Sequence, residues 1–118
     1  MMVYADHDMV TTILRNLVSN AIKFTPKNGN INISSSKENN FGILTITDTG
    51  IGIPANKLDE LFKPIKETTK GTSGESGTGL GLMLCKEFAI KNGGDILVKS
   101  EVGKGSSFIL SLPLAAHF

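Results

Sequence analysis

Apolar residues recur at helical spacing near the start of the chain. Asp6 can cap the N-terminus of a helix, and apolar positions follow it at Met9, Val10, Ile13, Leu14, Leu17, Val18, Ala21 and Phe24. The Thr25-Pro26 pair ends this pattern, because the residue before a proline is driven out of the helical region. We therefore predict an amphipathic helix between Asp6 and Thr25, preceded by a short edge strand over residues 1–5.

Two pairs of segments alternate between apolar and polar residues, as half-buried strands do. The first pair covers residues 31–34 and 42–48, on either side of a turn at residues 37–40. The second pair covers residues 95–100 and 106–112, on either side of the glycine-containing residues 102–105. Each pair predicts an antiparallel hairpin.

Two further helices and a long polar loop lie between the hairpins. Pro54 suits the first turn of a short helix over about residues 54–62, and a second amphipathic helix covers about residues 78–91. Residues 66–76 contain no apolar side chain, and polar loops of that length are usually lids or binding loops. The order of elements predicts one α+β domain over residues 1–118, a two-layer sandwich with three helices on one face of a mixed, mostly antiparallel sheet.

Composition narrows the classes of function. The 118 residues suffice for one domain, and 40% of them are hydrophobic, so the chain can bury a core. Twelve Lys and Arg against eleven Asp and Glu leave a formal charge of +1, which argues against a nucleic-acid or polybasic membrane surface. The single cysteine excludes an internal disulfide and a multi-cysteine zinc site, and no apolar run approaches the roughly 20 residues of a membrane-spanning helix.

Glycine is concentrated in the middle of the chain, where seven of the 13 glycines fall within residues 50–81. One group follows a predicted strand, in the segment Asp48-Thr49-Gly50-Ile51-Gly52-Ile53-Pro54. A carboxylate at a strand end can accept a hydrogen bond from an exocyclic amino group, and Gly50 and Gly52 would let the backbone pass close to a flat ring. An ordinary Asp-x-Gly turn explains the same segment equally well.

A second glycine group opens the predicted helix near residue 78, in the segment Gly77-Thr78-Gly79-Leu80-Gly81-Leu82. Bare amide N–H groups at a helix N-terminus bind anions, and three alternating glycines weaken a helix unless a ligand or close packing requires them. No P-loop motif occurs, and Leu82 stands where a dinucleotide fingerprint needs its third glycine. A phosphate site of another kind is indicated.

The first helix also carries a polar stripe. Asn16, Asn20 and Lys23 stand at positions i, i+4 and i+7 and therefore share one face. Amide oxygens are ligands for a hard cation such as Mg²⁺, and an ammonium group complements phosphate. A solvated helix face accounts for the same spacing, so the stripe alone leaves both interpretations open.

Taken together, these segments resemble the catalytic, ATP-binding domain of two-component sensor histidine kinases. Residues 14–25 resemble the family's N box, residues 48–54 its G1 box, residues 61–64 its F box and residues 77–82 its G2 box. The resemblance extends from about Ala5 to Pro113 and implies a Bergerat-type sandwich of helices over a mixed sheet. Four motifs in family order make it far more specific than any one of them.

The resemblance assigns roles to individual residues. At the base, Asp48 would contact the adenine amino group, Gly52 with Gly50 and Ile53 would lie beside the ring, and Phe24 would lie near the adenine or ribose. At the phosphates, Asn20 with Asn16 would hold Mg²⁺ and Lys23 would reach a phosphate oxygen. The G2-box residues would cradle the phosphates: Gly77, Thr78, Gly79, Leu80, Gly81 and Leu82. Residues 65–76 would form the ATP lid, in which Lys70, or alternatively Lys66, replaces the usual arginine.

The same resemblance favours a kinase over a hydrolase. Related ATPases such as DNA gyrase carry Glu where this chain has Asn16, and an amide cannot activate water as a general base. The implied function is transfer of the γ-phosphoryl group of Mg·ATP to a histidine on a dimerisation domain, with a response regulator downstream. No dimerisation hairpin precedes the domain, so we expect a monomeric fragment that is inactive alone. We expect the domain to be cytoplasmic, and the sequence leaves open whether its parent protein is anchored in the inner membrane. The alternatives are a non-catalytic nucleotide-binding or protein-interaction module and an ATPase of the same superfamily.

Overall fold

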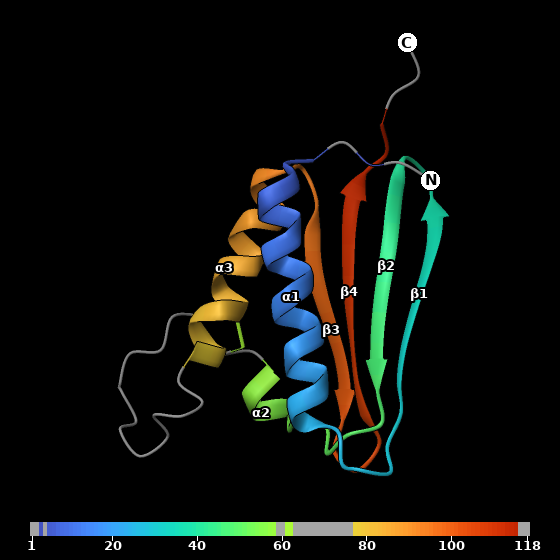
Figure 1. Cartoon of the computed structure of the whole chain (residues 1–118), viewed down its shortest axis with the longest axis vertical. Coiled ribbons are helices and arrows are strands. Elements are labelled where there is room, and N and C mark those ends of the chain that lie inside the picture. The colour runs from blue at the N-terminus through green and yellow to red at the C-terminus, as the bar shows by residue number, and fades with distance from the viewer. Residues whose placement is uncertain (1–2, 4, 59–60, 63–76, 116–118) are drawn as a thin grey trace.

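The computed structural model describes residues 3, 5–58, 61–62 and 77–115, with residues 77–81 described by their backbone alone. In this part of the chain, helices lie along one face of a four-stranded sheet (Figure 1). The helices are α1 (His7–Phe24), α2 (Ala55–Leu58) and α3 (Gly77–Lys91), and the strands are β1 (Ile31–Glu38), β2 (Phe41–Asp48), β3 (Asp95–Glu101) and β4 (Gly105–Pro113). The predicted α+β sandwich is confirmed.

Helix α1 begins and ends where its sequence predicts. An oxygen of the Asp6 carboxylate accepts a hydrogen bond from the Met9 N–H at 2.9 Å, which satisfies one of the free donors at the helix N-terminus. Thr25, ahead of Pro26, has extended backbone angles and ends the helix. Within the described residues, no helix is long and apolar enough to cross a membrane.

The sheet has the strand order β1-β2-β4-β3, and every neighbouring pair is antiparallel. Both predicted hairpins are therefore confirmed, although β1 runs to Glu38 rather than ending at Ser34. The described strands contain no parallel pair of the kind that a mixed sheet includes. Among the residues described near the N-terminus, the predicted edge strand is reduced to one antiparallel bridge between Val3 and Leu114.

The core lies between the inner face of the sheet and helices α1 and α3. Even-numbered residues of β2, β3 and β4 share this face, because successive side chains of a strand point to opposite sides. The buried apolar residues are Ile13, Leu17, Ala21, Ile46, Leu82, Cys85, Ala89, Ile96, Phe108, Leu110 and Leu112. Cys85 is 0% exposed. Burial raises the pKa of its thiol to about 11, so the side chain packs as a small apolar group rather than acting as a nucleophile.

The remaining helices differ from prediction mainly in length. Helix α2 covers Ala55–Leu58 and is shorter than the predicted helix over residues 54–62. Leu61 and Phe62, near the end of the predicted range, lie in a turn. Helix α3 begins one residue earlier than predicted, and it ends at Lys91 as expected. The predicted lid over residues 65–76, with Lys70, lies outside the described residues.

Candidate functional site

A cavity opens beside the end of α1. Its volume is about 150 Å³, which is roughly ten times the volume that one water needs. Its walls come from α1, the segment after β2, the turn after α2, the start of α3 and strand β4. The lining residues are Asn20, Phe24, Asp48, Ile51, Gly52, Ile53, Pro54, Leu61, Leu82, Ser106 and Phe108. Most of these side chains are apolar, so a ligand here would be recognised by a few polar groups on an apolar wall.

Asp48 is the principal charged group of this cavity. It is the last residue of β2, and its side chain is buried although it carries a carboxylate. Oδ1 accepts a hydrogen bond from the Gly50 N–H at 2.8 Å. One such bond leaves acceptor capacity on the two carboxylate oxygens for a ligand. A buried carboxylate with spare acceptor capacity favours a ligand that carries a donor group.

The two glycines after Asp48 are required by close backbone packing. Gly52 has φ of +79°, and a Cβ there would collide with the carbonyl oxygen of Glu101. A Cβ on Gly50 would collide with the carbonyl oxygen of Phe24. Gly52 lines the cavity. Gly50 does not line it, and its N–H donates a hydrogen bond to the Asp48 carboxylate. Both glycines therefore serve the protein's own packing as well as any approach to a ligand.

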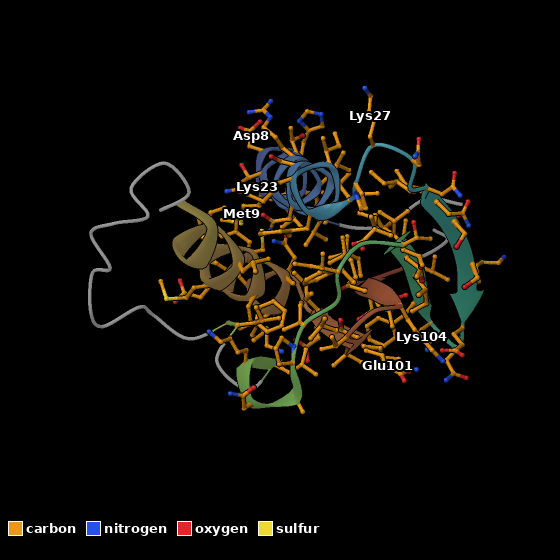
Figure 2. The ribbon with its side chains drawn as sticks, turned by 90° about the horizontal axis from the view of Figure 1, so that it is seen from below. Asp8, Met9, Lys23, Lys27, Glu101 and Lys104 are labelled. Carbon is orange, nitrogen blue, oxygen red and sulfur yellow. The ribbon has the colours of Figure 1, made fainter. Side chains whose placement is uncertain are left out.

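The three residues of the polar stripe on α1, Asn16, Asn20 and Lys23, do not all face the cavity. Asn20 lines the cavity, while Asn16 lies near Cys85 of α3, close enough for its side chain to lower the pKa of that thiol against the larger effect of burial. The Asn16 Nδ2 also donates to the carbonyl oxygen of Thr12 at 2.9 Å. Lys23 is exposed, and its Nζ lies 5.7 Å from the centroid of the Phe24 ring. Figure 1 shows the end of α1, where Lys23 lies, at the same end of the molecule as the turn from β3 to β4, and Figure 2 labels Glu101 and Lys104 beside that turn.

The start of α3 completes this end of the site. The backbone of Gly77, Thr78, Gly79, Leu80 and Gly81 forms the first turns of α3, whose first four N–H groups have no partner within the helix. Leu82, the next residue, is buried and lines the cavity. The predicted G2-box residues thus begin at the helix terminus and end at the cavity wall.

Two hydroxyl groups at the site were missed by the sequence reasoning. Ser106 is 7% exposed, lines the cavity and pairs in register with Asp48 across β2 and β4. Ser100 on β3 pairs in register with Ser106, and their Oγ atoms are 2.8 Å apart. The alternation of residues 106–112 contained a usable signal, because it puts the Ser106 hydroxyl at the end of an otherwise apolar face.

A lysine on α3 connects that helix to β3 and to an aromatic pair at the cavity wall. Nζ of Lys86 on α3 lies 2.8 Å from Oδ1 of Asp95 and donates to the carbonyl oxygen of Ile96 at 3.0 Å. The same Nζ lies 5.1 Å from the centroid of the Phe62 ring, which meets Phe108 edge-on with centroids 6.5 Å apart. Since Phe108 lines the cavity, this chain of contacts ties α3 and β3 to the cavity wall.

The ion pair of Lys86 makes stability depend on pH. Desolvation raises the pKa of Asp95, but the hydrogen bonds from Lys86 and from the Ile96 N–H, with the charge of Lys86, outweigh it and hold that pKa below its ordinary value. A carboxyl whose folded pKa is lowered stabilises the protein above its unfolded pKa, and this contribution is lost as the pH falls through the folded pKa.

We expect Asp95→Asn to lower the free energy of unfolding by no more than about 1 kcal/mol near neutral pH, because the side chain is 46% exposed and solvent screens the pair. The difference from wild type should vanish in acid, where both proteins carry a neutral group. Urea unfolding across the acid range measures it. Glu101→Gln is the control, because its 3.8 Å pair with Lys104 is exposed on both sides. A difference that persists in acid would contradict the assignment.

Comparisons with known proteins agree on one family. A model of histidine kinase-, DNA gyrase B- and HSP90-like ATPases matches residues 5–116. The autoinducer 2 sensor kinase/phosphatase LuxQ of Vibrio parahaemolyticus is 39% identical over 119 residues, which cover 95% of this chain and 14% of LuxQ. The chain therefore spans a small part of that relative.

Solved structures agree with the sequence matches. The catalytic domain of the histidine kinase ThkA is similar with a TM-score of 0.78 at 33% identity, over 93% of this chain and 69% of that one. Full-length ShkA in complex with AMPPNP is similar with a TM-score of 0.80 at 28% identity, over 98% of this chain and 23% of ShkA.

Proposed function

The chain belongs to the family of histidine kinase-, DNA gyrase B- and HSP90-like ATPases, and from that premise we propose that it binds Mg·ATP and transfers the γ-phosphoryl group to a histidine on a partner dimerisation domain. The chain spans 14% of LuxQ, so the acceptor histidine is proposed to lie on a domain outside the matched region. In its parent protein this chain would work in the cytoplasm and a response regulator would receive the phosphoryl group. The observation that carries the proposal is the buried Asp48 carboxylate in the wall of an apolar cavity.

The cavity suits a flat base with an exocyclic amino group. Asp48 has acceptor capacity beyond its hydrogen bond from Gly50, and the 6-amino group of adenine is a donor that can use it. Ile53, Leu82 and Phe108 supply apolar walls for the ring. Phe24, which is 42% exposed at the cavity, would cover the base or the ribose. AMPPNP, which the related ShkA binds in its solved structure, is an analogue of ATP.

The phosphates would lie toward the start of α3. The first four amides of α3, which belong to Gly77, Thr78, Gly79 and Leu80, would face the phosphate oxygens, since a helix N-terminus favours negative charge, and Gly81 would let a phosphate come close to the helix. Lys23 at the end of α1 would add a cation, and Lys70 would contribute another from the lid.

The asparagines of α1 are suited to hold the metal of Mg·ATP. Because Nδ2 of Asn16 donates to the carbonyl oxygen of Thr12, its Oδ1 is the ligand atom it can offer. Asn20, one turn further along α1, lines the cavity and would be the nearer ligand. The bound ion would neutralise charge on the phosphates, which is the main requirement of phosphoryl transfer.

Asn16 also favours transfer over hydrolysis. An amide cannot take a proton from water at neutral pH, and the Nδ2 of this one already donates to the carbonyl oxygen of Thr12. We therefore expect the domain to hold ATP intact until a histidine from the dimerisation domain attacks the γ-phosphorus, with ADP as the leaving group.

The test supplies γ-labelled ATP and Mg²⁺ to this domain together with the dimerisation domain of its parent protein. Acid-labile, base-stable label on the dimerisation domain supports the kinase, and a dimerisation domain with its acceptor histidine changed to Gln is the control. ATP binding without transfer would instead support the non-catalytic module. Steady release of phosphate by the domain alone would support the ATPase and contradict the argument from Asn16.

A further inference from the structure

Lys86 lies behind the cavity rather than in its lining. It follows Leu82 by one turn of α3, so the two side chains belong to the same row of the helix, and Leu82 is buried at the cavity. The Lys86 side chain is 28% exposed, which is low for a residue type that solvent normally surrounds. Its contacts therefore need a reason beyond the solubility of the helix.

The ammonium group of Lys86 joins three elements of the fold. It carries three N–H donors, and its Nζ lies 2.8 Å from Oδ1 of Asp95 and donates to the carbonyl oxygen of Ile96 at 3.0 Å. The third partner is the ring of Phe62, whose centroid lies 5.1 Å from Nζ, within the range of a cation–π contact. Two partners belong to β3 and one to the turn after α2, so a single charge on α3 connects both.

The partners of Lys86 on β3 give the cation a fixed place. In the described sheet β3 is an end strand, so side chains can reach its free edge. Ile96 is 0% exposed, its carbonyl oxygen accepts from Lys86, and its N–H donates to Oδ1 of Asp95 at 2.8 Å. Because the strand holds Nζ, a ring in contact with the cation takes its position from β3.

The turn that carries Phe62 needs such a contact. The backbone N–H of Leu61 donates to the carbonyl oxygen of Leu58 at 3.3 Å, which is long for this type of bond. Phe62 itself is half-buried. A segment that few strong bonds hold is displaced more easily than a helix or a strand, so one side-chain contact can decide where it lies.

The Phe62 ring extends this constraint to the cavity. It meets the Phe108 ring edge-on, with centroids 6.5 Å apart and planes at 83°, which is a favourable arrangement for two aromatic rings. Phe108 lines the cavity, and so does Leu61, the neighbour of Phe62 in the chain. A shift of the Phe62 ring would therefore move two side chains of the apolar wall, although Phe62 is not part of the lining.

We propose that Lys86 is a positioning residue for nucleotide binding: its ammonium group, anchored on β3, holds the Phe62 ring against Phe108 and so keeps the apolar wall in the shape that accepts the base. The inference rests on the proposed binding of ATP. It assigns a role to a charge that lies outside the cavity lining and acts on the nucleotide through two aromatic rings.

The experiment measures the affinity of ADP with Mg²⁺ by calorimetry for wild type, Lys86→Met, Phe62→Leu and the double variant. Lys86→Met keeps an apolar stem and removes the charge, and it should bind ADP about fivefold more weakly, as expected for one partly buried cation–π contact. Phe62→Leu should lose at least as much. The double variant should bind ADP within about twofold of Phe62→Leu, because the cation has no ring to hold once Phe62 is gone.

Lys91→Met is the matched control. It makes the same chemical change on an exposed lysine in the last turn of α3, outside the cavity lining, and its ADP affinity should stay within about twofold of wild type. Lys86→Arg keeps the charge and can stack on the ring, so it should restore ADP binding to within about twofold of wild type. If Lys86→Met does not fold, Lys86→Gln takes its place with the same expected loss, because its amide is uncharged.

The outcomes separate this inference from the proposed function. Wild-type binding of ADP with an unchanged affinity in Lys86→Met would overturn the role of Lys86 alone. Losses that multiply in the double variant would also overturn it, because Lys86 would then act independently of Phe62, and so would a failure of Lys86→Arg to restore binding. A wild-type protein that does not bind ADP would overturn the proposed function together with the inference.

Discussion

Asp48→Asn is expected to weaken the binding of ADP by about 100-fold, or about 2.7 kcal/mol, while leaving the fold intact. The loss exceeds that of a single deleted hydrogen bond because of the orientation of the new amide. The Gly50 N–H needs an oxygen acceptor, so the substituted side chain would keep its oxygen there and turn its NH₂ group toward the base. A donor would then face the donor of adenine, which both loses a charge-assisted bond and leaves two donors unpaired.

The same substitution should improve the relative binding of inosine diphosphate, whose 6-carbonyl oxygen can accept from the new amide. Calorimetry with both diphosphates and Mg²⁺ measures the two affinities. Asp8→Asn is the matched control: it makes the same chemical change on an exposed side chain in the first turn of α1 that does not line the cavity, and its ADP affinity should stay within about twofold of wild type. Unchanged ADP binding in Asp48→Asn would remove the assignment of Asp48 to the base.

Gly52→Ala is expected to destabilise the protein by about 1–3 kcal/mol and to weaken nucleotide binding as well. At φ of +79° a Cβ is strained, and here it would also collide with the carbonyl oxygen of Glu101. The collision is with backbone, so relief requires the segment after β2 to move away from β3. Because Ile53 follows directly and donates to Ser100, that movement would alter the cavity wall.

Gly103→Ala separates strain from collision. Gly103 has φ of +85°, but a Cβ there would meet nothing within 4 Å. This control should carry the cost of its backbone conformation, about 1–2 kcal/mol, and should bind ADP like wild type. Urea unfolding and calorimetry on both variants make the comparison. Equal effects of the two substitutions on ADP binding would show that contact with Glu101 has no part in shaping the site.

Helix-capping residues, the residue before a proline and the alternation of apolar and polar residues predicted most of the helices and strands. Asp6 and the Thr25-Pro26 pair set the ends of α1, because capping and the restriction before proline act within a few residues. Alternation predicted both hairpins, yet it stopped β1 at Ser34 although pairing with β2 continues to Glu38. Residues 35–38 are polar and exposed, so cross-strand hydrogen bonding rather than burial keeps them in the strand.

The motifs also identified the family, which the match over residues 5–116 confirms. The roles of individual residues stay predictions, and the structure divides them by location. Asn20, Phe24, Asp48, Gly52, Ile53 and Leu82 line one cavity, whereas Asn16 lies against Cys85 and Gly50 lies behind Asp48. Helical spacing alone could not separate Asn16 from Asn20, because the contact of α3 with α1 decides what each turn of the helix faces.

The sequence by itself determined the helices and hairpins, the order of the motifs and the candidate acceptor Asp48, because each depends on neighbours in the chain. Only the tertiary structure brought Ser100 and Ser106 to that acceptor, through strands that are far from Asp48 in sequence and pair beside it in the sheet. It also decided that Gly52 must lack a side chain, through a carbonyl group that belongs to Glu101. Hydrogen bonding and close packing between distant segments become visible only when the strands are paired, and they shape the wall around the candidate ligand.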